Sequence, residues 1–144
     1  MSGDFLLTMS DHLFEASILD DLARLPSRDG VTLAVDYRIE AVFDLDDATK
    51  VQVEDGRIVA IDKRLTTYNA VDCGLFRCSP RVFDALAEAQ AGGRMSLSDG
   101  MQGLGRRGLF HAMDIGTRWW QDVDTPEMAQ EATARLAKFD ARER

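Results

Sequence analysis

The sequence predicts an α/β fold with a mainly parallel sheet and one antiparallel hairpin. Short apolar runs alternate along the chain with segments of helical hydrophobic spacing, which is the pattern of strands joined by crossover helices. One pair of extended runs is instead separated by the two residues Asp55-Gly56, and this spacing is typical of a tight hairpin. Together these observations favour a sheet with helices packed on it.

The N-terminal part of the chain contains two predicted strands and one helix. Residues 5–9 form a short apolar run without alternation, which is typical of a strand buried on both faces. A helix is predicted over residues 15–25, where apolar side chains recur at helical spacing, and Pro26 ends it. The next predicted strand covers residues 31–37.

The rest of the chain supplies the hairpin, two more strands and three helices. The hairpin joins residues 49–54 to residues 57–63, and residues 70–78 and 109–115 are predicted strands. Each further helix is predicted to start at a hydroxyl residue that can cap its first turn: Ser79, Ser96 and Thr125. Sheets of this kind bind ligands beyond the carboxyl ends of their strands.

Length and charge narrow the classes of function. The 144 residues are 45% hydrophobic, which suits one globular domain over residues 1–144. The net charge of −8 disfavours a nucleic-acid partner, since such proteins need clustered lysine and arginine. No apolar run approaches the roughly 18 residues of a membrane span, so we expect a cytoplasmic protein without membrane contact. Cys73 and Cys78 are expected as free thiols on opposite faces of one strand.

Two acidic segments follow predicted strands and are candidate metal sites. Asp11 ends the first strand, and Asp122 and Asp124 precede the last helix. Carboxylates from distant strands that converge on one hard cation are the arrangement that phosphoryl and nucleotidyl transfer needs. Taken one at a time, each position also suits a helix cap or a turn. A Ser-His-Asp mechanism has little support, because His12 and His111 are the only histidines and no nucleophile elbow is present.

Four segments, in this order and at this spacing, resemble the inositol-1-phosphate cytidylyltransferase branch of the nucleotidyltransferases. They are residues 5–14 (FLLTMSDHLF), the hairpin region with 47–51 (DATKV), 54–58 (EDGRI) and Lys63, residues 72–76 (DCGLF), and residues 120–127 (WQDVDTPE). The resemblance spans nearly the whole chain. It implies a Rossmann-like α/β sheet.

The resemblance also implies the residues of a site. It places a magnesium ion (Mg2+, or Mn2+) on Asp11 and Asp124, with Asp122 as neighbour or substitute. For the phosphate and polyol of the acceptor it implies Lys63, Asp72 and Gly74, and we expect His12 to touch the same molecule. The implied reaction is attack by an acceptor phosphate oxygen on the α-phosphorus of a nucleoside triphosphate, CTP in this branch, with release of pyrophosphate.

The chain departs from the family pattern at several positions. Cys73 stands where threonine is usual, Asp62 where glycine is expected, and Met128 where an acidic residue is expected. No counterpart of the glycine-rich loop that holds the nucleotide precedes the first strand. Residues 103–108 (GLGRRG) match Gly-x-Gly-x-x-Gly, but they end a predicted helix, so we interpret Gly108 as a helix stop.

These features predict the C-terminal half of a nucleotidyltransferase, a partial domain that carries the acceptor and metal side and lacks the N-terminal nucleotide-binding strands. We expect no cytidylyl transfer by this chain alone. The alternatives are a non-catalytic remnant, one subunit of a split enzyme, or a type A glycosyltransferase-like binder of sugar nucleotides, which also uses an Asp-x-Asp pair. An unpaired first strand predicts association through that edge, either with an N-terminal half or as a homodimer.

Overall fold

The computed structural model describes residues 3–93, 97–123 and 125–143. Within these ranges six strands form one sheet: β1 (Phe5–Thr8), β3 (Val31–Asp36), β4 (Lys50–Glu54), β5 (Arg57–Asp62), β6 (Ala70–Cys78) and β7 (Phe110–Asp114). A separate ribbon pairs β2 (His12–Phe14) with β8 (Trp120–Asp122). The helices are α1 (Ala16–Arg24), α2 (Arg81–Ala91), α3 (Leu97–Arg106) and α4 (Pro126–Glu143), with short 3-10 turns at Ile39–Ala41 and Leu45–Asp47. The predicted α/β class is confirmed.

The sheet is mixed rather than mainly parallel, which corrects the sequence prediction. Its strand order is β1-β6-β3-β7-β5-β4. Among the described strands only β3 and β7 pair in parallel, while β6 runs antiparallel to β1, β3 and β4. The prediction assumed that helices connect neighbouring strands. β6 instead follows the hairpin without a crossover helix and enters the sheet between β1 and β3 in the opposite direction.

β6 also links the two ends of the sheet order. Its first two residues, Ala70 and Val71, pair with β4, and its last four, from Leu75 to Cys78, pair with β1. β3 pairs with β6 on the other edge along both stretches. β4 and β1 therefore share one edge of β6, and Gly74, with a φ of +79°, lies between them.

β3 is buried on both faces, and the prediction that β1 would be so was wrong. All residues of β3 are buried, because it has strands on both edges and helices over both faces. β1 is only partly buried, since within the described chain it pairs with β6 alone. Beside it Phe83 of α2 is 60% exposed and stacks on Phe5, with ring centroids 5.5 Å apart. Association through this edge stays a prediction.

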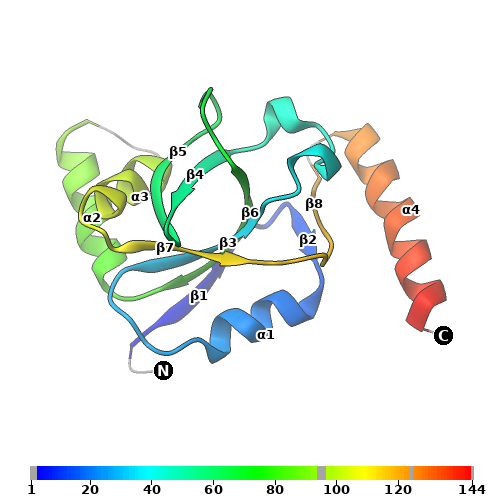
Figure 1. The fold of residues 1–144 in the computed structure, drawn as a ribbon, viewed down its shortest axis with the longest axis horizontal. Coiled ribbons are helices and arrows are strands. Elements are labelled where there is room, and N and C mark those ends of the chain that lie inside the picture. Colours follow the sequence, from blue (N-terminus) through cyan, green and yellow to red (C-terminus); the bar gives the residue numbers. More distant parts are fainter. Residues whose placement is uncertain (1–2, 94–96, 124, 144) are drawn as a thin grey trace.

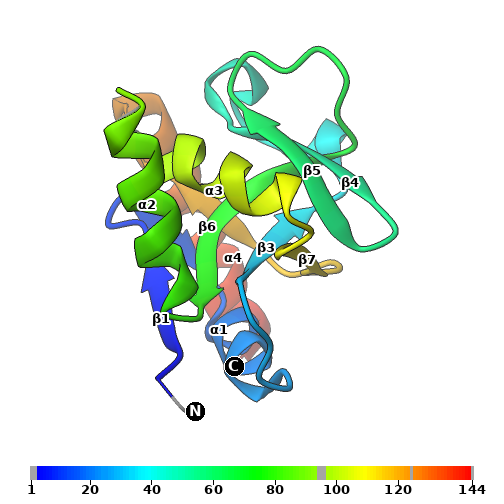
Figure 2. The ribbon, with the colours of Figure 1, turned by 90° about the vertical axis from the view of Figure 1, so that its left-hand side faces the viewer.

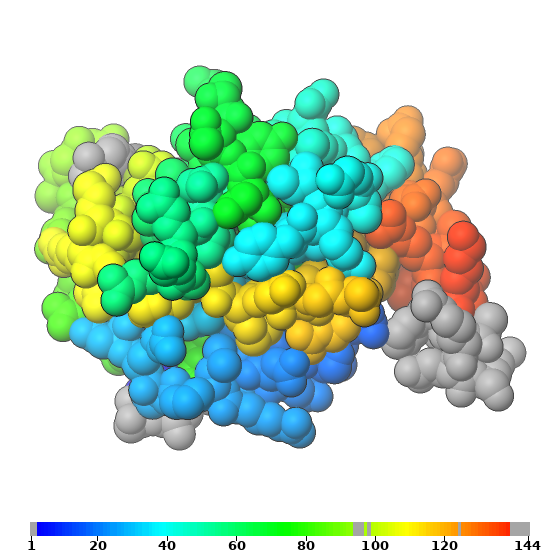
Figure 3. Space-filling model, in the orientation of Figure 1, coloured from blue at the N-terminus to red at the C-terminus, as the bar shows by residue number. Residues whose placement is uncertain are grey.

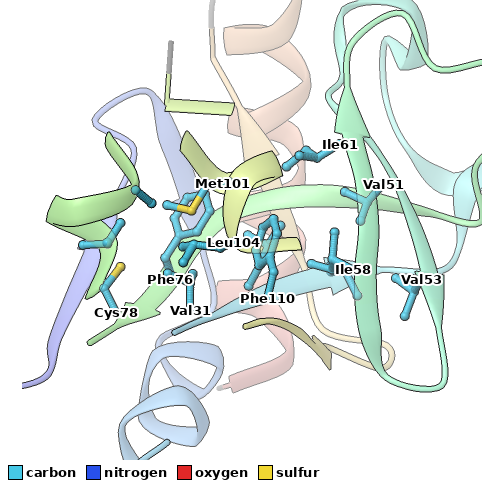
Figure 4. Close-up of a cluster of buried hydrophobic side chains, with 14 of the residues drawn as sticks. Val31, Val51, Val53, Ile58, Ile61, Phe76, Cys78, Met101, Leu104 and Phe110 are labelled. Carbon is cyan, nitrogen blue, oxygen red and sulfur yellow. The ribbon is translucent and has the colours of Figure 1, made fainter. Parts of the chain in front are cut away.

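Helices cover the sheet on two sides. α1 lies against one face, and α2 and α3 lie against the other (Figures 1 and 2). Figure 4 shows the larger of two apolar clusters, in which Met101 and Leu104 of α3 pack near Phe110 of β7. Cys78 belongs to this cluster and Cys73 to the cluster beneath α1. The two free thiols thus lie on opposite faces, as predicted.

Two turn predictions from glycine are confirmed. Asp55 and Gly56 adopt positive φ values of 51° and 77° between β4 and β5, as a two-residue hairpin requires. The glycine motif at residues 103–108 lies at the C-terminal end of α3, and Gly108 follows the helix with a φ of 71°. A Cβ atom on Gly105 would stand 3.0 Å from the carbonyl oxygen of Ile58, so this glycine lets α3 approach β5 closely.

α4 extends along the side of the molecule away from α2 and α3 (Figures 1 and 3). Its start is as predicted, because the Thr125 hydroxyl accepts the backbone N–H of Met128 at 3.2 Å. Ser96, the predicted cap of α3, lies outside the described residues. None of the described helices is both long and apolar enough to cross a lipid bilayer.

Candidate functional site

The predicted site residues surround one cavity. It has a volume of about 250 Å³ and opens between the end of β1, the β2–β8 ribbon, the loop before β4, and β6. Every predicted site residue that the structure describes lines it: Asp11, His12, Lys63, Asp72, Gly74 and Asp122. Asp124, the other predicted metal ligand, lies outside the described residues. Apolar side chains complete the wall: Met9, Ile61, Phe76, Leu97, Met101 and Trp120.

The β2–β8 ribbon brings the first and last acidic segments together. In its antiparallel register His12 stands opposite Asp122. The backbone N–H of Val123 donates to the carbonyl oxygen of Asp11 at 2.7 Å. Two segments from opposite ends of the sequence thus contribute carboxylates to the same wall. The sequence did not reveal this ribbon, because strands of three residues are too short to show a periodic pattern.

The His12 ring is held by contacts on several sides. Its Nδ1 lies 2.8 Å from Oδ1 of Asp11, and since a carboxylate only accepts hydrogen bonds, Nδ1 carries the proton. The ring stacks on Trp120, with centroids 5.8 Å apart and planes 9° from parallel. A Cβ atom on Gly74 would stand 2.7 Å from the ring, so only glycine leaves room for it. His12 is therefore a rigid part of the wall, with 15% of its side chain exposed.

Asp72 is a half-buried carboxyl group beside this ring. Burial raises its pKa from 3.8 to about 6, and this effect is opposed by a hydrogen bond from Gly74 and by the nearby His12. The backbone N–H of Gly74 donates to Oδ1 of Asp72 at 2.6 Å. Because burial of its carboxylate is costly, a ligand hydroxyl that donates a hydrogen bond to Asp72 would stabilise the charged group.

Lys63 reaches the cavity from the end of β5. Its Nζ lies 3.3 Å from Oδ1 of Asp47, and both side chains are well exposed, at 57% and 38%. Ion pairs of this kind contribute little free energy, so a phosphate group can replace Asp47 as the partner of Lys63 at small cost. Lys50 is buried and donates to the carbonyl oxygens of Asp46 and Lys63, at 3.2 and 2.9 Å, which holds the two loops together.

Asp47 and Trp120 also line the cavity, although neither had a predicted role. Asp47 begins the run 47–51 that contributed to the family resemblance, and Trp120 begins the run 120–127. Their positions in these runs were the available signals. Neither local pattern shows that the side chain faces a cavity, because that depends on how the loop before β4 and the β2–β8 ribbon fold over β6.

The electrostatics of the wall favour a cation. The pKa of Asp122 is raised, first by burial and also by the neighbouring carboxylates of Asp47 and Asp11, while His12 lowers it. A carboxyl group whose pKa is raised by like charges gains when a cation enters, since the repulsion is then neutralised. The acidic groups near Asp122 are thus arranged to receive positive charge.

The donor set around the cavity fits a magnesium ion. Asp11 and Asp122 offer carboxylate oxygens, the hard ligands that this ion prefers. Among the described residues no group of three His, Cys, Asp or Glu side chains is close enough to form a protein-only metal site. Magnesium is commonly bound by one or two carboxylates, with waters and substrate phosphates completing its shell, so two carboxylates are a sufficient protein contribution.

We expect Asp72→Asn to stabilise the protein at neutral pH. The pKa of Asp72 is higher in the folded chain than its ordinary value, so its stabilising contribution is complete below pH 3.8 and is lost as the pH rises through 6. Because asparagine does not ionise, the free energy of unfolding of Asp72→Asn at pH 8 should exceed that of the parent chain by about 2 kcal/mol. Urea unfolding at pH 8 and pH 4 tests this, and the difference should vanish at pH 4. Asp20→Asn, on the exposed surface of α1, is the control, and equal effects of both variants would contradict the assignment.

Curated relatives match almost the whole chain. Three of them are named bifunctional IPC transferase and DIPP synthase. The protein from Aquifex aeolicus is 32% identical over 139 residues, and that from Thermococcus kodakarensis is 34% identical over 140 residues. The Rubrobacter xylanophilus protein is 36% identical over 124 residues. The first two matches cover 96% of this chain and 30% of each relative, so the chain spans less than a third of their length. No protein-family model matches the chain.

Solved structures agree in fold. The inositol-1-phosphate CTP transferase from T. maritima superposes with a TM-score of 0.77 at 29% identity. The predicted resemblance to the nucleotidyltransferases is confirmed. The superposition covers 89% of this chain and 52% of the transferase. A putative glucose-1-phosphate thymidylyltransferase from Bacillus anthracis superposes with a TM-score of 0.71 at 16% identity, and this similarity concerns the fold alone. The chain thus has the fold of about half of a nucleotidyltransferase.

Proposed function

We propose that this chain forms the acceptor and metal side of a nucleotidyltransferase that moves a nucleotidyl group, CMP from CTP, onto a polyol or sugar phosphate such as inositol 1-phosphate. One observation carries the proposal. The residues that the family resemblance implies for metal and acceptor, scattered from Asp11 to Asp122 in the sequence, line a single cavity. The names of the relatives supply the reaction class.

The cavity suits a phosphorylated polyol in both size and chemistry. Lys63 offers a positive charge at the rim for the acceptor phosphate, and its ion pair with Asp47 is weak enough to be replaced. Asp72 accepts hydrogen bonds from hydroxyl groups deeper in the cavity. The closely packed Gly74 and His12 shape the wall between them. These contacts orient the acceptor, so the contribution of this chain to the rate is positioning and electrostatics.

Asp11 and Asp122 would hold the divalent cation, magnesium or manganese, together with Asp124. When bound, the ion neutralises the charge that develops on the phosphoryl oxygens as the acceptor phosphate displaces pyrophosphate. The hydrogen bond from His12 to Asp11 keeps one carboxylate oxygen of that residue oriented. The carboxylates of Asp11 and Asp122 are then the proposed ligands.

A split enzyme, in which a partner segment supplies the nucleotide-binding part, is the second candidate. The chain covers 52% of the solved transferase. Within the described residues the Gly-x-Gly-x-x-Gly motif belongs to the end of α3 and packs against β5, so it offers no phosphate loop at the cavity. Such a segment could pair with the edge of β1, beside which the exposed Phe83 stacks on Phe5. The glycosyltransferase alternative gains no support, since the relatives are named for other transfers.

Acceptor binding tests the proposal directly. We expect inositol 1-phosphate to bind in the presence of magnesium, and Lys63→Gln to weaken this binding roughly tenfold, or about 1.4 kcal/mol, because a charged hydrogen-bond donor to phosphate is lost. Isothermal titration calorimetry provides the measurement. Arg64→Gln is the matched control, since it removes the neighbouring positive charge outside the cavity lining. Equal loss in both variants would indicate general electrostatic attraction and would refute the assigned role of Lys63.

A further inference from the structure

We infer that Asp36 is a positioning residue that keeps the Asp11–His12 pair in place through the indole of Trp120. This inference deepens the proposed function and rests on it for the role of Asp11 as a metal ligand. The contacts that carry it are independent of that role, and they join the end of β3 to the wall of the cavity.

Asp36 is a buried carboxylate that accepts hydrogen bonds from both Arg38 and Trp120. It is the last residue of β3, and only 3% of it is exposed. Arg38 donates to it twice, from Nε to Oδ1 at 3.0 Å and from Nη2 to Oδ2 at 3.2 Å. The indole N–H of Trp120 donates to Oδ2 at 2.9 Å in a buried hydrogen bond. A charged acceptor in a buried position makes this hydrogen bond stronger than one between neutral groups.

Trp120 connects Asp36 to the residues of the cavity wall. Its ring stacks on His12, and His12 in turn hydrogen-bonds Asp11. His12 also packs against Gly74, and the ring fills the space that a side chain at this position would occupy. The imidazole is therefore held between β6 and an indole whose own orientation is set by Asp36.

Trp120 is 7% exposed and packs in the apolar cluster beneath α1, and parts of it also line two cavities. One is the site described for the acceptor. The other has the same volume, about 250 Å³, and is lined by Asp36 and Arg38 together with residues of β8 and α4. Because part of the indole borders these cavities, packing restrains it less completely than a side chain that is surrounded on all sides. The hydrogen bond to Asp36 adds a directional contact that fixes the orientation of the indole.

The first test follows the His12 ring directly by proton NMR. The chain has two histidines, so His12 is assigned by comparison with His111→Gln. The ring current of the indole shifts the imidazole proton signals of the stacked His12, whereas those of His111 are not shifted by this stack. The displacement of the His12 signals therefore reports the stacking on Trp120. We expect Asp36→Asn to reduce this displacement, whereas Asp114→Asn, an exposed change at the end of β7, should leave it intact.

Divalent-cation affinity supplies the second readout. Loss of a group that orients a metal ligand commonly weakens metal binding 10- to 100-fold, so Asp36→Asn should weaken manganese binding roughly tenfold. Trp120→Phe keeps an aromatic ring and the Asp36–Arg38 pair but removes the N–H, and it should act in the same direction. Trp119→Phe is its matched control, because the Trp119 N–H has no hydrogen-bond partner among the described residues.

The results distinguish a failure of the positioning role of Asp36 from a failure of the proposed metal site. Unchanged His12 signals and unchanged manganese affinity in both Asp36→Asn and Trp120→Phe would overturn the positioning role. If the parent chain binds no manganese, the proposed metal site fails, while the His12 signals still decide whether Asp36 positions the ring. If Asp36→Asn does not fold, Trp120→Phe compared with Trp119→Phe gives the decision.

Discussion

Asp11→Asn should remove most of the divalent-cation affinity of this chain. The substitution keeps the size of the side chain and leaves the backbone bond from Val123 to the Asp11 carbonyl in place. It removes the negative charge that magnesium or manganese requires, and we expect manganese binding to fall at least tenfold. Asp122→Asn and Asp124→Ala should show losses in the same direction. Calorimetric titration with manganese measures all three.

The control for these variants is Asp46→Asn. Asp46 lies next to Asp47, but its side chain is exposed and it does not line the cavity. Asp46→Asn changes the net charge of the chain by the same amount as Asp11→Asn does. If Asp46→Asn reduces manganese binding as much as Asp11→Asn does, the ion is held by diffuse negative charge and the site assigned to it is wrong.

Gly74→Ala should be among the most damaging single changes in the chain. Alanine at this position meets two separate penalties: a φ of +79°, which residues with a Cβ rarely adopt, and a distance of 2.7 Å from the new Cβ to the His12 ring. We expect the free energy of unfolding to fall by about 2–4 kcal/mol, since backbone strain and overpacking each cost roughly 1–3 kcal/mol. Urea denaturation measures the change.

Two further variants separate the penalties. Gly93→Ala has a similar φ of +82° with no atom within 4 Å, so it should show the backbone cost alone. Adding Gly74→Ala to a His12→Ala chain should also cost only that amount, because the ring that the methyl group strikes is gone. If Gly74→Ala costs the same with and without His12, the ring is not packed against this glycine and the described wall is incorrect.

Much of the fold was predictable because its signals are local. Pro26 and the apolar spacing before it predicted α1, Asp55-Gly56 predicted the β4–β5 hairpin, and the Ser79 boundary predicted the end of β6. The site residues were predictable in part through the family resemblance, which singled out Asp11, Lys63 and Asp72. The direction of β6, the burial of β3 and the β2–β8 ribbon were not predictable, because each depends on pairing between segments distant in the sequence.

The sequence by itself determined which segments become helices and turns, and which residue types are available for chemistry. Helical spacing, capping hydroxyls and glycines act over a few residues, so they can be recognised without a structure. Only the tertiary structure decided that Asp11 and Asp122 face one cavity, that Asp47 joins them, and that Trp120 links His12 to Asp36. Those relations arise because β6 inserts between β1 and β3 and the ribbon folds over it, and no short stretch of sequence encodes that long-range pairing.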